Sequence, residues 1–204
     1  MKGSIFAFAA VLLSGGCAVS ETTSYRDQRA THYRSALVAV LTTDIRVRRL
    51  GEAAIVKAMA DKKLRGVPSI TYVPPTRTLN GPALLAAARA AGLDAILVFR
   101  VRRWGSSNRY VPAQYIPGTT TTSLERWGNT TYAVTRTSPG RIEGGYNVSA
   151  PWAKYSATLY DARTRKRVWV SQTDSGGNSY TRQRDLFHSA ARSVAAALIK
   201  DGVM

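Results

Sequence analysis

The clustered arginines are the residues of this sequence whose chemistry points most clearly to a function. Arg supplies 22 of the 29 basic residues, and two clusters lie within 100–109 and 163–167. A guanidinium fork pairs carboxylates and phosphates through parallel hydrogen bonds, so such clusters suit anionic surfaces. The candidate contacts to an anionic partner are Arg100, Arg102, Arg103, Arg109, Arg163, Arg165, Lys166 and Arg167. A merely solvated face would show the same residues, and both interpretations stay open.

Aromatic side chains accompany the first arginine cluster. Trp104, Tyr110 and Tyr115 follow or interleave with its basic residues. Exposed aromatic residues on an adaptable loop are typical of protein-binding surfaces, so these three are candidate contacts. A hairpin that packs on its own sheet explains them equally well.

Residues suited to catalysis or metal binding are few. The 204 residues include one Cys and two His, His32 and His188, which excludes a disulfide framework and a cysteine-rich metal site. The twelve Asp and Glu residues form no close pair on one predicted element, and no glycine loop has phosphate-binding spacing. We therefore expect a protein that is not an enzyme and needs no metal or cofactor, with His188 as a partly buried side chain.

The lone cysteine lies at an informative place. Nine apolar residues, Ile5 to Leu13, precede three small residues and then Cys17. Because a membrane span needs about 20 apolar residues, residues 1–16 are predicted to be a secretory signal peptide. Small residues directly before a cysteine resemble a bacterial lipobox, in which that cysteine is acylated and becomes the mature N-terminus. Ala18 in place of Asp then implies passage to the outer membrane, while an ordinary signal peptide remains the alternative.

The net charge of +17 belongs almost wholly to the exported part, which keeps +16 because the predicted signal peptide holds one Lys and no acid. Hydrophobic residues at 45% and charged residues at 20% are ordinary globular values. Nucleic acid is not an expected partner outside the cytoplasm. The anions available in the periplasm are lipid phosphates, lipopolysaccharide and peptidoglycan carboxylates. We expect membrane contact through the lipid anchor, and contact with an envelope protein or an anionic envelope polymer through the surface.

The mature chain is predicted to begin with a tether. Residues 17–35 comprise the acylated cysteine and a polar segment without periodicity, which favours a flexible linker. Residues 36–204 are predicted to form a single α/β domain in the periplasm. The first half of that domain alternates strands at 37–44, 69–73 and 93–104 with helices at 46–64 and 81–91, a pattern typical of an α/β sheet.

Finer details of these elements follow from side-chain periodicity. The helix at 46–64 should bury Val47, Leu50 and Ala54 and end at Gly66. Asn80 can cap the next helix. The strand at 93–104 keeps one apolar face, whereas its other face changes from Ile96 and Val98 to Arg100 and Arg102 and should emerge into solvent.

The second half is less regular. Residues 105–150 are rich in Thr, Ser, Gly and Tyr, and we expect an irregular excursion there, with an extended hairpin as one form of it. A β-hairpin with its turn at 161–166 follows. The final helix shows Leu186, Ala190 and Val194 at helical spacing. The predicted fold is thus a mixed sheet with three helices.

This order of elements, from Leu37 onward, resembles a family of Gram-negative lipoproteins of unassigned function. The resembling stretches are LVAVLTTD, AARAAGLDAILVFRV, LYDARTRKRVWVSQT and the final Lys-Asp-Gly. The hairpin turn has Arg165 where the family tends to place Gly. The arrangement is more loosely similar to the amino-terminal domain of TolB and to outer-membrane lipoproteins that activate peptidoglycan synthases. The resemblance implies a binding module without catalytic residues.

These observations together predict a lipoprotein that is anchored in the outer membrane, faces the periplasm and acts as a non-catalytic binding or adaptor module. The alternative is a structural envelope protein that binds anionic lipid or peptidoglycan through its basic face. An enzyme of unknown type comes third.

Overall fold

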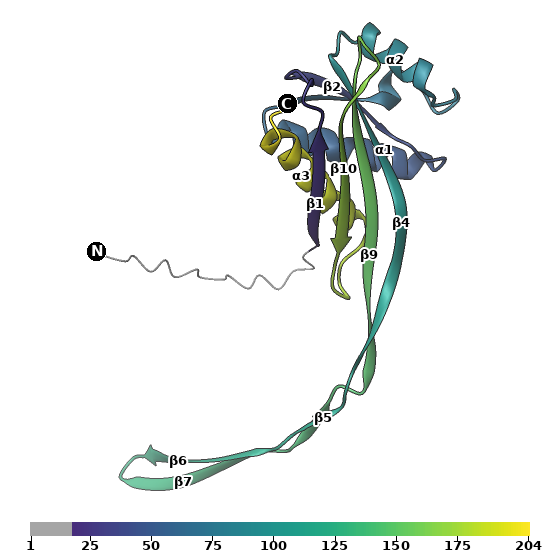
Figure 1. Cartoon of the computed structure of the whole chain (residues 1–204). Helices are drawn as coiled ribbons and strands as arrows, with labels where there is room; N and C mark the ends of the chain where they lie inside the picture. Colours follow the sequence, from purple (N-terminus) through teal and green to yellow (C-terminus); the bar gives the residue numbers. More distant parts are fainter. Residues whose placement is uncertain (1–17) are drawn as a thin grey trace, which may run out of the picture. The chain divides into compact units, whose positions relative to one another are not determined.

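The computed structural model describes residues 18–204 (Figure 1). Its sheet contains six strands in the order β1-β10-β9-β4-β2-β3. Their bounds are β1 Val19–Arg26, β2 Ser35–Val40, β3 Arg65–Pro68, β4 Ala95–Val111, β9 Tyr146–Asp161 and β10 Arg167–Gly176. β2 runs parallel to β3 and β4, whereas β10 runs antiparallel to β1 and β9. The predicted mixed sheet and α/β class are confirmed. The signal peptide at 1–16 and acylation at Cys17 lie outside the described residues and stay predictions.

Three helices accompany the sheet, as predicted. They are α1 Ile45–Ala60, α2 Gly81–Ala90 and α3 Gln183–Lys200, and a short 3₁₀ helix, η1, spans Ser69–Thr71. Asp44 caps α1 by accepting the N–H groups of Arg46 and Val47, and Asn80 caps α2 by accepting the N–H of Ala83. Of the described residues, none belong to a helix with the length and hydropathy to cross a membrane.

The chain forms two compact units. One consists of residues up to Ser107 and from Ala150 onward, and the other of Asn108–Ser149. The first unit contains the helices and the main sheet, and it is called the α/β unit below. The second contains only strands, and it is called the ribbon unit.

The core of the α/β unit lies between the sheet and the pair α1 and α3. Phe99, Tyr155 and Phe187 form its aromatic centre, with ring centroids 5.2 to 5.4 Å apart. Gly51 of α1 lies against the Phe187 ring, where a Cβ atom would approach Cε1 to 2.8 Å. Glycine at this point therefore lets α1 and α3 pack closely. The predicted stripe of the last helix is buried, including Leu186, Ala190 and Val194.

The opposite face of the sheet is covered by α2 over a smaller cluster. Leu84 and Ala88 of α2 pack with Leu37 of β2 and Ile96 of β4. The two sides of β4 are therefore both buried at its start. Further along, Arg100 and Arg102 are exposed on the α2 side while Phe99 stays buried on the other. The predicted change of character along this strand is confirmed.

The prediction of a flexible tether over 18–35 is wrong. β1 pairs along its whole length with β10, from Val19 opposite Gly176 to Arg26 opposite Trp169. The side chains that β1 turns toward α3 are polar, and they are satisfied there: the Thr22 hydroxyl lies 2.8 Å from that of Thr173 and 2.7 Å from that of Ser193. Hydrophobic alternation could not indicate this strand, because its inner face carries hydrogen-bonded hydroxyl groups instead of apolar side chains.

Residues around β3 also differ from expectation. The strand predicted at 69–73 lies instead at β3, since Arg65 to Pro68 pair with β2. The next residues turn into η1, because buried Glu52 accepts the hydroxyl of Ser69 at 2.6 Å and the N–H of Ile70 at 2.8 Å. The predicted helix end at Gly66 is wrong as well. Gly66 lies in β3, where a Cβ would come within 3.0 Å of Met59 Sδ.

The excursion predicted for 105–150 takes its extended-hairpin form in the ribbon unit, and its strands are regular instead of irregular. β5 Gln114–Ile116 pairs with β8 Arg141–Glu143, and β6 Thr119–Trp127 pairs with β7 Thr130–Ser138, both antiparallel. A two-residue loop that begins with Gly128, at φ 65°, joins the longer pair. The threonines of β6 and β7 are β-branched strand residues, and Thr120 and Thr122 pair with Thr137 and Thr135 across the ribbon. No residue of this unit is buried.

Candidate functional site

The uncovered part of the sheet is the candidate site. On the side away from α1 and α3, α2 packs over β2 and β4, and the antiparallel strands β9, β10 and β1 are left open. Strand alternation places Lys154 and Ser156 of β9 on this open face, together with Gln172 and Asp174 of β10. β4 adds Arg100 and Arg102. The open face is therefore polar and charged.

A hollow of about 730 Å³ lies on the open face. Its charged lining consists of Arg100, Arg102, Arg103, Lys154 and Asp174. Lys154 Nζ lies 2.9 Å from Asp174 Oδ2, and both side chains are exposed, so this pair adds little to stability. Among residues 18–204, no carboxylate forms an ion pair with any of the three arginines. Their charge is thus free to act on a ligand.

The charge of the open face changes from the edge strand β1 across the sheet to β4. Glu21 of β1 stands opposite Asp174 of β10, and Asp174 stands opposite Lys154 of β9. β4 then presents only arginines at its exposed positions next to the hollow. A ligand with negative charge is consequently drawn to the β4 side, and β1 offers acidic groups instead.

The second predicted arginine cluster is divided by the structure. Arg163, Arg165 and Lys166 lie in the turn between β9 and β10, and Arg167 opens β10; all four are exposed. Arg165 shares with Arg100 a groove beside α2. Arg163 lines a separate small hollow with His32 and Asp94. The clusters 100–109 and 163–167 therefore share a cavity only through Arg100 and Arg165. Arg109, also predicted as a contact, belongs to the ribbon unit.

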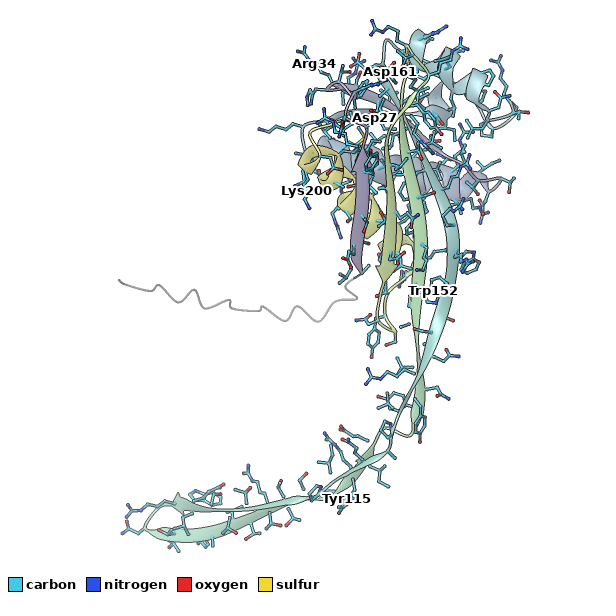
Figure 2. All side chains as sticks on the ribbon, viewed as in Figure 1. Asp27, Arg34, Tyr115, Trp152, Asp161 and Lys200 are labelled. Atoms are coloured by element: carbon cyan, nitrogen blue, oxygen red, sulfur yellow. The ribbon has the colours of Figure 1, made fainter. Side chains whose placement is uncertain are left out.

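The turn that carries Arg165 is built around Asp161 (Figure 2). Oδ1 of Asp161 accepts the backbone N–H groups of Arg163 at 2.8 Å and Thr164 at 2.7 Å, and Oδ2 accepts the hydroxyl of Tyr33 at 3.0 Å. Burial acts to raise the pKa of Asp161, but these hydrogen bonds outweigh it and hold the pKa below its usual value. Burial raises the pKa of Tyr33. Arg165 itself adopts φ 63°, a left-handed conformation that favours glycine.

The candidate aromatic contacts lie in both units. Trp104 is 70% exposed on β4 of the α/β unit. Its neighbour Gly105 is covered by the indole of Trp152 from β9, so one aromatic of this region packs on its own sheet. Tyr110 and Tyr115 are exposed in the ribbon unit, where the Tyr115 ring lies against Gly140.

One charged cluster is structural and was missed at the sequence level. Arg48 belongs to a basic run on α1, but it is buried, with Nε 3.0 Å from Glu52 Oε1. Its Nη2 also donates to the hydroxyl of Ser69 at 3.0 Å and to the carbonyl of Val73 at 2.8 Å. The signal was present, since an Arg and a Glu four residues apart share one helix face. Leu50, predicted to be buried, is 40% exposed in its place.

Groups that could do other chemistry are sparse. His188 is partly buried on α3, as predicted, and His32 is exposed. Among the described residues, no three His, Cys, Asp or Glu side chains are grouped so that they could hold a metal ion. The chemical capacity visible in residues 18–204 is therefore anion recognition by arginine.

Comparison with known proteins gives structural neighbours only. No protein-family model matches the sequence, and no curated protein does. The fold is similar to the PelC dodecamer from Paraburkholderia phytofirmans, at 15% identity and TM-score 0.48, covering 89% of this chain and 97% of that one. It is also similar to the lipoprotein GNA1162 from Neisseria meningitidis, at 16% identity and TM-score 0.42, covering 82% and 96%. The neighbours of the fold thus include a lipoprotein.

Proposed function

We propose that this protein is a lipid-anchored, non-catalytic binding module of the outer membrane that faces the periplasm and holds an anionic envelope partner on its open sheet face. The observation that carries the proposal is the hollow on that face, which is lined by Arg100 and Arg102 without ion-pair partners among residues 18–204. The anchor would be the acylated Cys17.

The arrangement suits recognition of phosphate or carboxylate groups. Arg100 and Arg102 lie two residues apart on one face of β4. Their Cα atoms are therefore about 7 Å apart, because a strand rises about 3.4 Å per residue. Two guanidinium forks at that spacing can each take an oxyanion bidentately. Lys154 lines the same hollow, but its ammonium is paired with Asp174 at 2.9 Å, so Arg100 and Arg102 carry the recognition.

Binding to anionic surfaces tests this proposal. In a Cys17→Ser background, which removes the acylation site, the protein should float with vesicles that contain anionic phospholipid or pellet with peptidoglycan, and it should detach as salt rises. The double variant Arg100→Gln/Arg102→Gln should bind about tenfold more weakly, as expected when two charge-assisted contacts are lost.

A matched control separates the site from general charge. Arg46 and Arg49 are exposed on α1, which packs on the other face of the sheet. The double variant Arg46→Gln/Arg49→Gln removes the same charge and should bind as the parent does. Equal weakening by both double variants would show that the open face has no special role.

The anchor is tested separately. Cys17→Ser should release the protein from membrane fractions of cells, because the acyl chains supply the firm attachment. Unchanged retention in the outer membrane would contradict the anchor while leaving the open-face binding measurable on its own.

A second candidate function is that of a protein adaptor, and the ribbon unit favours it. Trp127 is 86% exposed, Leu124 76% and Ile142 73%, in a unit without any buried residue. Exposed apolar and aromatic side chains of this kind mark protein contacts. Crosslinking in cells from position 127 or 142 should yield one stoichiometric partner, and crosslinking from exposed Arg77 serves as the control. A diffuse crosslinking pattern would exclude the adaptor role.

A further inference from the structure

We propose that the groove between α2 and strands β4 and β9 binds an anionic amphiphile, namely one acyl chain that carries a phosphate or carboxylate head group. The groove encloses about 670 Å³. That size falls in the range of about 300 to 1,000 Å³ typical of small-molecule sites. The inference goes beyond the proposed function, since it concerns another cavity and a single small molecule.

The floor of the groove is apolar. Ile96 and Val98 of β4 line it from the sheet, and Leu84 and Leu85 line it from α2. Val98 and Leu85 are only partly buried, so both keep apolar surface open to the groove. Covering that surface with an acyl chain would remove apolar area from water, which favours binding.

The rim of the groove is cationic. It carries Arg89 from the last turn of α2, Arg100 from β4 and Arg165 from the β9–β10 turn. All three are exposed, and no ion pair in the described part of the chain engages any of them. Three guanidinium groups above an apolar floor match a molecule with one anionic end and one apolar end.

The only carboxylate that lines the groove does not neutralise this rim. Asp161 directs its oxygens to the N–H groups of Arg163 and Thr164 and to the hydroxyl of Tyr33. These donors hold the charge of Asp161 in place and fix the turn from which Arg165 projects. The remaining polar residues of the lining, Asn80 among them, are neutral, and Asn80 is engaged in capping α2.

The groove and the open-face hollow are distinguishable by residue. Arg100 lines both, whereas Arg102 lines only the hollow and Arg89 and Arg165 line only the groove. Loss of groove binding and loss of open-face binding can therefore be produced by separate variants.

The test is calorimetric titration of the purified protein with four probes below their micelle concentrations. Dodecyl phosphate and dodecanoate carry the two head groups, dodecyl maltoside carries the same tail without charge, and inorganic phosphate carries the head without a tail. We expect the two anionic amphiphiles, or dodecyl phosphate alone, to bind at least about tenfold more tightly than either control, because each control lacks half of the interaction. Preference for dodecyl phosphate identifies a lipid phosphate as the ligand class, and equal binding of both identifies any anionic acyl compound.

Two variants of α2 decide whether the groove is the site. Ala86 is exposed and lines the groove, so Ala86→Trp fills it without disturbing the core, and binding should fall at least about tenfold. Ala90 is exposed on the same helix outside the groove, and Ala90→Trp should leave binding unchanged. Arg102→Gln should also leave it unchanged, while weakening vesicle binding. Equal affinities of the Ala86→Trp and Ala90→Trp proteins, or equal binding of dodecyl maltoside and dodecyl phosphate, would overturn the proposal.

Discussion

The α/β unit and the ribbon unit are stabilised in different ways. In the α/β unit, helices α1 and α3 bury one face of the sheet around Phe99, Tyr155 and Phe187. In the ribbon unit, no side chain is buried, and its contacts are strand ladders, threonine pairs and exposed ion pairs such as Arg141–Glu143 at 2.6 Å. Two-stranded ribbons are marginal by themselves in water. The difference teaches that the ribbon unit has no interior of its own, and each prediction below measures where the stability of the protein resides.

The largest effect is expected from Glu52→Ala. This change leaves the buried guanidinium of Arg48 without its carboxylate and leaves Ser69 and Ile70 without an acceptor. The free energy of unfolding should fall by about 3 to 5 kcal/mol, as for other broken buried ion pairs. Urea unfolding measures it, and Glu52→Ala combined with Arg48→Met should recover much of the loss. A loss below about 1 kcal/mol would show that the cluster is not part of the packed interior.

A smaller loss is expected from Gly51→Ala. The added Cβ would meet Phe187 Cε1 at 2.8 Å and Val40 Cγ2 at 3.0 Å, which forces α1 away from α3. Overpacking costs about 1 to 3 kcal/mol and exceeds the gain of about 1 kcal/mol in helix propensity. Gly81→Ala is the control, because nothing lies within 4 Å of its Cβ position. A more stable Gly51→Ala protein would mean that the two helices pack less closely than described.

Alkaline unfolding should depend on Tyr155. Burial raises the pKa of this phenol to about 12, above its usual value of 10.0. A raised pKa means that the stabilisation is complete below pH 10, where both states are protonated, and is lost as pH rises toward about 12. At pH 11 the loss should be on the order of 1 kcal/mol. Comparing Tyr155→Phe with the parent at pH 8 and pH 11 measures it, since the variant lacks this part of the pH dependence. An identical pH dependence in both proteins would refute the assignment.

The smallest effect is expected in the ribbon unit. Leu124→Ser and Trp127→Ser replace side chains that are 76% and 86% exposed, so the unfolding of the purified protein should change by less than about 0.5 kcal/mol. The same variants should weaken capture of a covering partner, if that partner binds the ribbon. A large loss of stability in the purified protein would contradict the contrast between the two units.

The sequence predicted well those elements whose stability comes from apolar periodicity or from caps. The stripe of α3 and the cap Asn80 follow directly from residue type and spacing. β1 was beyond such reasoning, because Thr22 and its neighbours are held by hydroxyl pairs from β10 and α3 that lie more than a hundred residues away. The bend after Pro68 depends on Glu52, which local preferences cannot show.

The residue types of the candidate site could be predicted from the sequence, but the positions of only some of its residues could. The change along one face of β4, from apolar Val98 to Arg100 and Arg102, could be predicted, because alternation alone sets which side chains share a face. The groove could not, because it depends on where α2 lies over the sheet and on the left-handed conformation of Arg165.

The pairing of β1 would also limit the distance from a membrane if Cys17 carries the proposed acyl chains. A single residue, Ala18, separates Cys17 from the first residue of β1. A chain reaches at most about 3.6 Å per residue, so acyl chains on Cys17 would hold the start of β1 within about 10 Å of the bilayer surface. Anchored in this way, the sheet would contact only molecules at or close to the inner leaflet of the outer membrane. No long linker would let it reach further into the periplasm.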